Sequence, residues 1–232
     1  MDIDTLTTLA NKNHVVFRGG FAVRQADRVP EHSDGEAAST LLLFGQTGNA
    51  LWPSFSQSPE YNDDEPHPMD RWSERVGNDL AETLNGQLLL PFGGPVHHPF
   101  IAWAIKAESL TPSRLGLLIH PLHGLWHAYR FAISVKGSVS GLGEPLEPRG
   151  ICASCADEPC LSACPVNAFD GHSYDVQTCA AHLRSNPNGP CLMQGCMARD
   201  ACPEGLPSRY EPEQRKFHMK QFMIAMQQRN QD

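Results

Sequence analysis

Cysteine is the residue type whose number and spacing point most directly to chemistry in this chain. All eight cysteines of the 232 residues lie between residues 151 and 203, in two groups of four. In each group the last cysteine is followed by proline, Pro165 or Pro203. The groups are Cys152, Cys155, Cys160 and Cys164, then Cys179, Cys191, Cys196 and Cys202. Thiolates are the ligands of iron–sulfur clusters, and a Cys-Pro ending is typical of bacterial cluster motifs. The pattern therefore predicts two four-iron clusters.

Two other uses of eight thiols have to be weighed against clusters. Disulfide frameworks belong to small secreted chains, and no apolar signal-peptide core follows Met1. Zinc also binds sets of four thiolates, and the Cys152-x-x-Cys155 spacing fits half of such a site. Zinc does not account for the two Cys-Pro endings or for the short spacing from Cys160 to Cys164. A structural zinc-binding domain stays open as an alternative.

The first group resembles the bacterial two-cluster ferredoxin pattern, except that four residues instead of two separate Cys155 from Cys160. With Pro159 before the third cysteine, this longer form is similar to the iron–sulfur subunits of larger oxidoreductases. The second group, in which an isolated Cys179 precedes three further cysteines, resembles the ferredoxin-like part of epoxyqueuosine reductase and its relatives. The resemblance covers about 50 residues. In that family a cobalamin-binding domain precedes the clusters, so the resemblance implies cobalamin as a further cofactor.

The resemblance also implies how the ligands are shared. In two-cluster ferredoxins the fourth cysteine of each run binds the other cluster. One cluster is then held by Cys152, Cys155, Cys160 and Cys202. The other is held by Cys164, Cys179, Cys191 and Cys196. Since this crossing ties both ends of the segment together, we expect metal binding and folding to be coupled.

Composition describes an acidic chain with enough apolar residues for a core. Hydrophobic residues make up 41%, charged residues 19%, and the formal net charge is −8. No run of 18 apolar residues is present, so we expect no membrane span. An acidic protein is a poor candidate for non-specific nucleic-acid binding, although a local basic patch could still bind tRNA. Reduced cysteines without an export signal indicate the cytoplasm.

Helical and strand patterns alternate ahead of the cysteines, which predicts an α+β fold. We expect a layered N-terminal α/β domain, a Gly- and Pro-rich linker, a ferredoxin-like two-cluster domain and a C-terminal helix. Their limits are 1–136, 137–150, 151–208 and 209–232. The proline-rich, acidic segment 53–68 is interpreted as a long surface loop or a lid.

Candidates for chemistry outside the cysteines are few. Five histidines form a second constellation, with His120, His123 and His127 in one loop: His97, His98, His120, His123 and His127. The loop is the best substrate-side candidate, and the alternative is that these are turn histidines hydrogen-bonded to backbone. Asp70, in the first turn of a predicted helix, and His123 are the catalytic candidates, although no motif in the N-terminal half matches the family position by position.

Two functional hypotheses from different classes follow. In the first, the chain is a reductase whose clusters deliver single electrons to a cofactor or substrate held by residues 1–150. In the second, it is an electron-transfer ferredoxin that serves a partner enzyme. The expected partners are an electron donor, such as a flavodoxin or ferredoxin reductase, and a small-molecule or tRNA substrate. The long N-terminal half, which contains all four tryptophans, favours the reductase because large apolar side chains can line a pocket.

Overall fold

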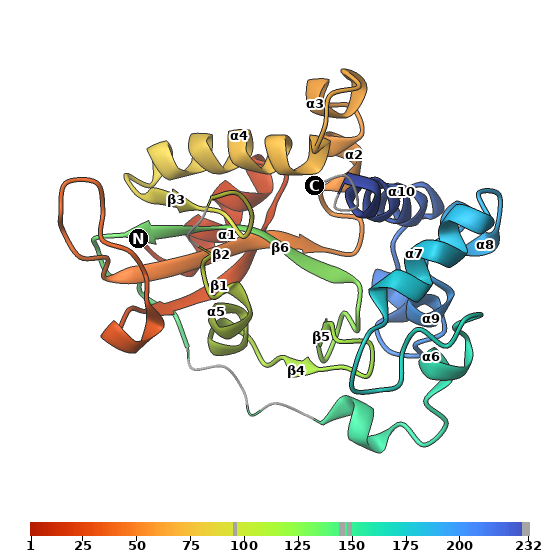
Figure 1. Cartoon of the computed structure of the whole chain (residues 1–232). Coiled ribbons are helices and arrows are strands. Elements are labelled where there is room, and N and C mark those ends of the chain that lie inside the picture. The colour runs from red at the N-terminus through yellow and green to blue at the C-terminus, as the bar shows by residue number, and fades with distance from the viewer. Residues whose placement is uncertain (95–96, 144–146, 148–149, 229–232) are drawn as a thin grey trace. The chain divides into compact units, whose positions relative to one another are not determined.

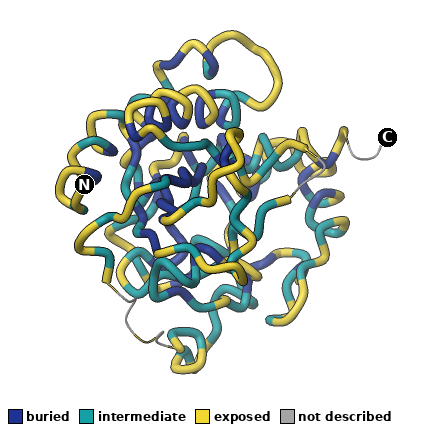
Figure 2. Tube along the Cα trace, turned by 90° about the vertical axis from the view of Figure 1, so that its left-hand side faces the viewer, coloured by how far each residue is buried: buried dark blue, intermediate teal, exposed yellow. Residues whose placement is uncertain are grey.

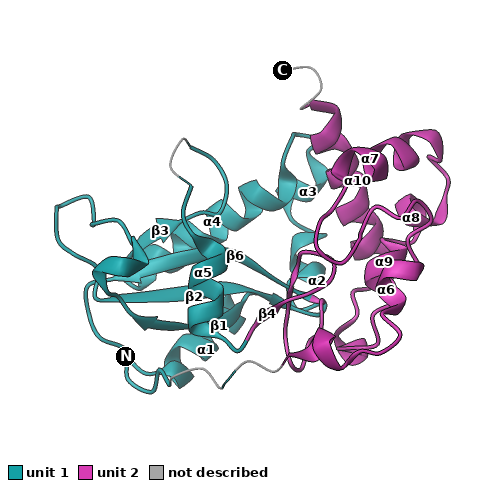
Figure 3. Cartoon of the chain, turned by 60° about the horizontal axis from the view of Figure 1, so that its bottom comes forward, with its two compact units in different colours: residues 1–109, 127–147 teal, residues 110–126, 148–232 magenta. Residues whose placement is uncertain are grey.

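The chain folds into two compact units. The computed structural model describes residues 1–94, 97–143, 147 and 150–228. The first unit contains residues 1–109 and 127–147, and the second contains residues 110–126 and 148–232 (Figure 3). Residues 110–126, which the sequence assigned to the N-terminal domain, thus belong to the unit that carries the cysteines. Within the described residues, no helix combines the length and the apolar character that crossing a membrane requires.

A four-stranded antiparallel sheet forms the centre of the first unit. Its order is β1-β2-β6-β3, and the strands are β1 (Val16–Ala22), β2 (Thr40–Thr47), β6 (His127–Val135) and β3 (Gln87–Leu89). Seven of the eight residues of β2 are buried. A continuous apolar run, Leu41 to Phe44, is what a central strand needs when both faces of the sheet are covered. The pairing of β1 with β2 shifts between Phe17 and Gly20, so Gly19 and Gly20 lie at a β-bulge.

Helices cover both faces of this sheet, which confirms the α+β class. The helices are α1 (Ile3–Lys12), α4 (Pro68–Thr83) and α5 (Phe100–Ala107), and η1 (Gln25–Asp27) is a short 3-10 turn. Helix α5 packs Trp103 against Leu41 and Leu43 on one face. Helix α4 lies on the opposite face, where Gly77 approaches Phe131 (Figure 1). Buried residues follow the strands and the inner side of α4 (Figure 2).

Segment 53–68 is not the long irregular loop that its prolines predicted. It contains two short helices, α2 (Trp52–Phe55) and α3 (Pro59–Asn62). Pro59 is tolerated because it occupies the first turn of its helix, where its missing N–H would have no partner. Phe55 packs edge-on against both Tyr61 and Trp72. The segment is therefore a packed part of the first unit.

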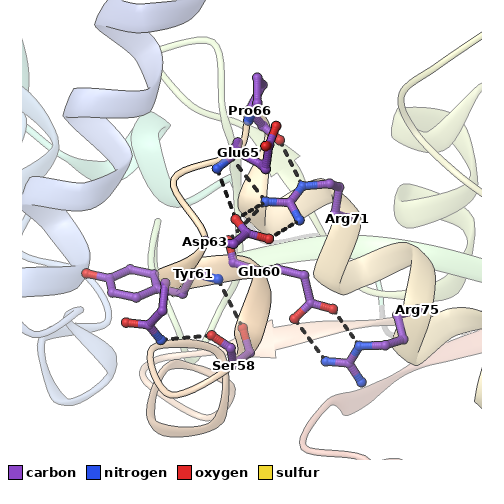
Figure 4. A network of polar contacts seen from close by, with 9 residues as sticks. Ser58, Glu60, Tyr61, Asp63, Glu65, Pro66, Arg71 and Arg75 are labelled. Atoms are coloured by element: carbon purple, nitrogen blue, oxygen red, sulfur yellow. Dashed lines mark hydrogen bonds and ion pairs between the residues drawn. The ribbon is translucent and has the colours of Figure 1, made fainter.

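Two arginines of α4 hold α3 in place through the network shown in Figure 4. Arg75 donates to both carboxylate oxygens of Glu60, at 2.5 and 3.1 Å. Arg71 donates to both oxygens of Asp63, at 2.7 Å each, and to the backbone oxygens of Pro66, Glu60 and Glu65. Bidentate arginine–carboxylate pairs fix geometry as well as charge. This argues for a fixed element and against a mobile lid.

The second unit consists of short elements and one long helix. Residues 110–126 contribute the two-stranded ribbon β4 (Thr111–Pro112) and β5 (Leu118–Ile119). The cysteine segment contains η2 (Ile151–Ser154), α6 (Pro159–Ser162), α7 (Val176–Ser185), α8 (Pro190–Met193), α9 (Met197–Asp200) and η3 (Leu206–Ser208). The chain then forms α10 (Pro212–Gln228). Residues 166–169 form no helix, and Phe169 instead forms an isolated β-bridge with Tyr174.

The methionine-rich face of α10 packs within the second unit. Met219, Phe222 and Met223 contact the buried cluster formed by Leu183, Cys191 and Leu192. The flexible methionine side chains suit the irregular surface that α7 and α8 present.

Candidate metal centre

Each cysteine lies on a short turn or helix whose local sequence explains its position. Pro159 and Pro190 start α6 and α8, which carry Cys160 and Cys191. Asp175 caps α7, which carries Cys179, by accepting from the backbone N–H of Thr178 at 2.9 Å. Cys152 lies within η2, and the other four follow or precede such turns: Cys155, Cys164, Cys196 and Cys202. The short helices thus present thiols from many directions within one small unit.

All eight cysteines are free thiols, and they are buried or half-buried. Burial in apolar surroundings is the main cause that raises the pKa of five of them, because a thiolate is poorly solvated there: Cys160, Cys179, Cys191, Cys196 and Cys202. For Cys196 the pKa rises to about 11. Such thiols are poor nucleophiles, so the arrangement does not suit thiol catalysis. A bound cation would compensate the cost of holding thiolates here.

Mutual repulsion sorts the thiols into two quartets. After burial, the pKa of Cys160 is raised by Cys202, Cys152 and Cys155. The pKa of Cys202 is raised in turn by Cys152 and Cys155. Cys202 thus neighbours the first three cysteines, although 42 residues separate it from Cys160 in the sequence. We call Cys152, Cys155, Cys160 and Cys202 the first quartet.

The other four thiols raise the pKa of one another in the same way. Cys164 and Cys191 raise the pKa of Cys179, while Cys179 and Cys191 raise the pKa of Cys196. In every case the thiols that raise the pKa of a cysteine belong to the same set of four as that cysteine. We call Cys164, Cys179, Cys191 and Cys196 the second quartet. This grouping is the one that the crossed ferredoxin pattern implies.

Backbone N–H groups point at the sulfurs. The N–H of Ala168 donates to Sγ of Cys164 at 3.2 Å. The N–H groups of Ala198 and Arg199, in the first turn of α9, lower the pKa of Cys196 by hydrogen bonding. Those of Met197 and Glu204 do the same for Cys191 and Cys202. Such N–H donors stabilise negative charge on cluster sulfurs and tune the reduction potential.

Soft donors in two sets of four, with N–H groups around them, fit two four-iron clusters. In the part of the chain that the structure describes, no three His, Cys, Asp or Glu side chains converge closely enough to hold one metal ion. A single tetrahedral zinc would need its four sulfurs about 2.3 Å from one point. The fit of this site to iron–sulfur clusters therefore rests on the grouping of the thiols and on their N–H donors.

The part of the histidine loop that holds His120 and His123 lies in the second unit, next to the last cysteine, whereas His127 lies on β6 in the first unit. Nδ1 of His120 accepts the backbone N–H groups of Leu122 and His123, at 3.0 and 3.2 Å. Nδ1 of His123 is 2.8 Å from Oγ of Ser208. These contacts agree with turn histidines bonded to backbone and hydroxyl groups. The structure brings His123 beside the turn that follows Cys202.

Residues 199 to 210 contact the segment 110–126, which contains the β4–β5 ribbon, and so pack it against the cysteine segment. The guanidinium of Arg199 lies over the rings of both Trp126 and Tyr210, 4.7 and 4.8 Å from their centroids. Arg199 also donates to the backbone oxygen of Leu125 at 2.5 Å. An arginine that lies over aromatic rings combines charge attraction with packing. The sequence analysis missed this arginine because its aromatic partners are 73 and 11 residues away.

Asp70 belongs to the first unit, whereas His123 belongs to the second. It is half-buried in the first turn of α4. Burial raises the pKa of Asp70, and the positive charges of Arg130 and His67 oppose that rise. A half-buried carboxyl group with a raised pKa is suited to donate a proton.

The other histidines occupy packed positions in the first unit. The ring of His98 stacks on Trp103 at 5.6 Å, and burial lowers the pKa of His98. His127 is buried, with Nδ1 3.3 Å from Nη2 of Arg18. His97, by contrast, is exposed.

A buried polar network in the first unit was missed by the sequence analysis. Arg18, on β1, is 1% exposed and donates through Nε to Glu108 at 3.0 Å. The hydroxyl of Tyr129 donates to the same carboxylate, and burial raises the pKa of Tyr129. The guanidinium also lies over the Tyr129 ring, 4.7 Å from its centroid. An arginine alternating with apolar residues in a predicted strand was the available signal.

Comparison with known proteins gives structural likenesses and no sequence match. No family model matches the chain, and no curated protein matches it. A crystal structure of selenomethionine-labelled epoxyqueuosine reductase is similar over 77% of this chain and 52% of that chain, with 14% identity and a TM-score of 0.42. A structure of epoxyqueuosine reductase with an epoxyqueuosine-modified tRNA-Tyr stem loop is similar over 92% of this chain and 68% of that chain, with 13% identity and a TM-score of 0.47. The chain spans about half the length of the first of these proteins.

Proposed function

We propose that this chain is an iron–sulfur redox protein that holds two [4Fe-4S] clusters and acts as a reductase on a substrate or cofactor bound by the first unit. The observation that carries the proposal is the sorting of eight free thiols into two quartets, each coupled within itself. When bound, clusters of this kind accept and donate single electrons.

The residues of the second unit divide the work of holding such clusters. The first quartet holds one cluster and the second quartet holds the other. The N–H groups of Ala168, Ala198 and Arg199 stabilise negative charge on the sulfurs of the second quartet. Because Cys202 closes the first quartet from the far end of the segment, cluster binding and the folding of the unit are coupled.

The first unit is the reason for proposing a reductase instead of a carrier. An electron carrier needs only the cysteine-bearing unit, whereas this chain adds a complete α+β unit with its own core. Asp70 supplies a half-buried carboxyl group there whose raised pKa favours the protonated form. We propose cobalamin, which the sequence resemblance implies, as the cofactor of this unit. The substrate is a small molecule or a tRNA, and the donor is a flavodoxin or ferredoxin reductase.

Electron transfer to added cobalamin tests this function. Protein purified without oxygen is reduced with dithionite, freed of excess dithionite and mixed with hydroxocobalamin. A reductase of this type shifts the corrin absorption bands on binding and then reduces the corrin in proportion to its stored electrons. The control is the double variant Cys202→Ala/Cys179→Ala, which lacks one ligand of each quartet and should reduce nothing. Reduced clusters that leave the corrin bands unchanged would contradict the cobalamin proposal and favour a carrier.

A further inference from the structure

A cavity of about 250 Å³ lies in the first unit, at the end of the sheet where β6 finishes. Its walls come from the end of β1, the start of β2, α5 and the segment 138–143 that follows β6. All of these belong to the first unit. Asp70, by contrast, feels the charge of Arg130, near the opposite end of β6. The cavity is therefore separate from the carboxyl group that is suited to donate a proton.

Hydrogen bonds fix the walls of this cavity. The N–H of Ser39 donates to the backbone oxygen of the last residue of β6 at 2.9 Å. The hydroxyl of Thr40 donates to the backbone oxygen of Gly137 at 2.8 Å. The segment after β6 is also tied to the start of the chain, because the N–H of Ser140 donates to the oxygen of Met1 at 3.0 Å. The cavity is therefore already formed, as small-molecule binding sites usually are.

Two cations, Arg24 and Lys106, line the cavity, and none of the described residues that line it is a carboxylate. Nζ of Lys106 lies 2.6 and 2.5 Å from the two carboxylate oxygens of Asp27, and 4.2 Å from the centroid of the Phe21 ring. The charge of Lys106 is therefore already balanced. Arg24 is exposed, and within the described part of the chain its guanidinium has no ion-pair partner. Arg24 thus supplies the net positive charge of the cavity, in a form that suits a carboxylate.

The other side chains of the cavity are hydroxyl groups and apolar groups. Ser39 and Ser138 contribute the hydroxyls, and Phe21, Val139 and Leu142 contribute the apolar surface. A hydroxyl group can donate a hydrogen bond to a carboxylate, and an apolar surface suits a hydrocarbon chain. The volume equals that of about eight molecules of liquid water, at about 30 Å³ each. Such a volume admits a small molecule and excludes a nucleotide or a corrin.

From this cavity we infer a binding site in the first unit for a small monocarboxylate that carries a short apolar chain. The carboxylate pairs with Arg24, and the chain lies against Phe21 and Leu142. A phosphate dianion fits less well, because Asp27 already balances the charge of Lys106. The site needs no cluster and lies apart from Asp70, so it goes beyond the reductase function.

Equilibrium dialysis of radiolabelled hexanoate against the full-length protein, purified without oxygen, tests this site. We expect saturable binding of one hexanoate per chain, with a dissociation constant on the order of 1 mM. Hexanamide has nearly the same shape but no charge. It should compete at least about tenfold more weakly than unlabelled hexanoate, because hydrogen bonds to a charged group are the stronger ones.

Three substitutions locate the binding. Arg24→Ala should weaken hexanoate binding at least about tenfold. Arg28→Ala is the matched control, because Arg28 is an exposed arginine of the same turn that does not line the cavity, and it should bind hexanoate as the wild type does. Leu142→Trp fills the apolar side of the cavity, keeps both cations and should abolish binding. Urea denaturation confirms that each variant is folded.

Hexanoate affinity at the wild-type level in Arg24→Ala or Leu142→Trp would overturn the site, as would an equal loss in Arg28→Ala. Competition by hexanamide or by inorganic phosphate as strong as that by hexanoate would overturn the carboxylate as the recognised group. Absence of saturable hexanoate binding up to about 10 mM would overturn the site as well. All of these outcomes leave the iron and sulfide content unchanged, so the cluster proposal is judged separately.

Discussion

Gly124 and Glu204 touch through their backbones: a Cβ built on Gly124 would lie 2.2 Å from the carbonyl oxygen of Glu204. Gly205 is equally close from the other side, since its Cβ would lie 2.2 Å from the carbonyl carbon of His123. The histidine loop is therefore packed on the turn that begins two residues after Cys202. The loop therefore lies close to Cys202, a member of the first quartet.

Replacing Gly124 with alanine should disturb the first quartet. The new methyl group would clash with backbone that cannot move away, and the φ of +56° is itself unfavourable for alanine. We expect a loss of about 3 kcal/mol in the free energy of unfolding, measured by urea denaturation. Gly116→Ala is the matched control: its φ is +72° but no atom lies within 4 Å of the added Cβ. It should cost only about 1 kcal/mol. Equal losses would refute the close-packing explanation.

The crossed ligand sets predict how pairs of cysteine substitutions combine. Cys202→Ala should lower the iron content from about eight to about four atoms per chain. Adding Cys152→Ala should cost no further iron, because both residues serve the first quartet. Adding Cys179→Ala should instead remove the remaining iron, because that residue serves the second quartet. Iron analysis of the two double variants measures this, and the reverse pattern would show that Cys202 belongs with Cys179.

Glu60 should make the stability of the protein depend on pH. Hydrogen bonds from Arg75 lower the pKa of Glu60 from 4.5 to about 2. Because the folded pKa lies below the unfolded one, the stabilisation is fully present above about pH 4.5 and is lost as the pH falls toward 2. Glu60→Gln should cost on the order of 1 to 3 kcal/mol at pH 7 and flatten the pH dependence of the unfolding free energy below pH 5.

The control for this substitution is Glu74→Gln, which removes an exposed carboxylate from α4. It should change the free energy of unfolding by less than about 0.5 kcal/mol both at pH 7 and below pH 5. Urea denaturation followed by tryptophan fluorescence at several pH values measures both variants. If the Glu60→Gln protein kept the wild-type slope below pH 5, the ion pair would not be the source of the dependence.

The pair of Arg18 and Glu108 should be costly to break. Glu108→Gln leaves a guanidinium that is 1% exposed without its counter-charge, and such losses amount to about 3–5 kcal/mol. The exposed pair of Lys136 and Glu36 provides the comparison, since Glu36→Gln should cost at most about 1 kcal/mol. Thermal unfolding of both variants measures the difference. Similar losses from the two substitutions would show that burial of Arg18 adds nothing.

Regular periodicity made much of the first unit predictable from the sequence. The apolar run at Leu41 to Phe44, the four-residue spacing after Met69 and the cap at Asp2 lead directly to β2, α4 and α1. Segment 53–68 was misread because proline suggests a loop, whereas Pro59 begins a helix. Its anchoring by Arg71 and Arg75 depends on contacts from another helix that sequence spacing does not reveal.

The cysteines were the predictable part of the site, and their surroundings were not. Ligand types and spacing are local, so the eight positions could be named from the sequence alone. Arg199 and the ribbon 110–126 are brought to the cysteine unit by contacts between residues far apart in the chain.

The iron and acid-labile sulfide content of protein purified without oxygen tests the proposal of two clusters most directly. Two four-iron clusters require about eight of each per chain, together with broad visible absorption that dithionite bleaches. That result would support the two quartets and direct attention to the first unit as the site of reduction. Zinc without sulfide would contradict the account and leave a structural metal domain with no role in electron transfer.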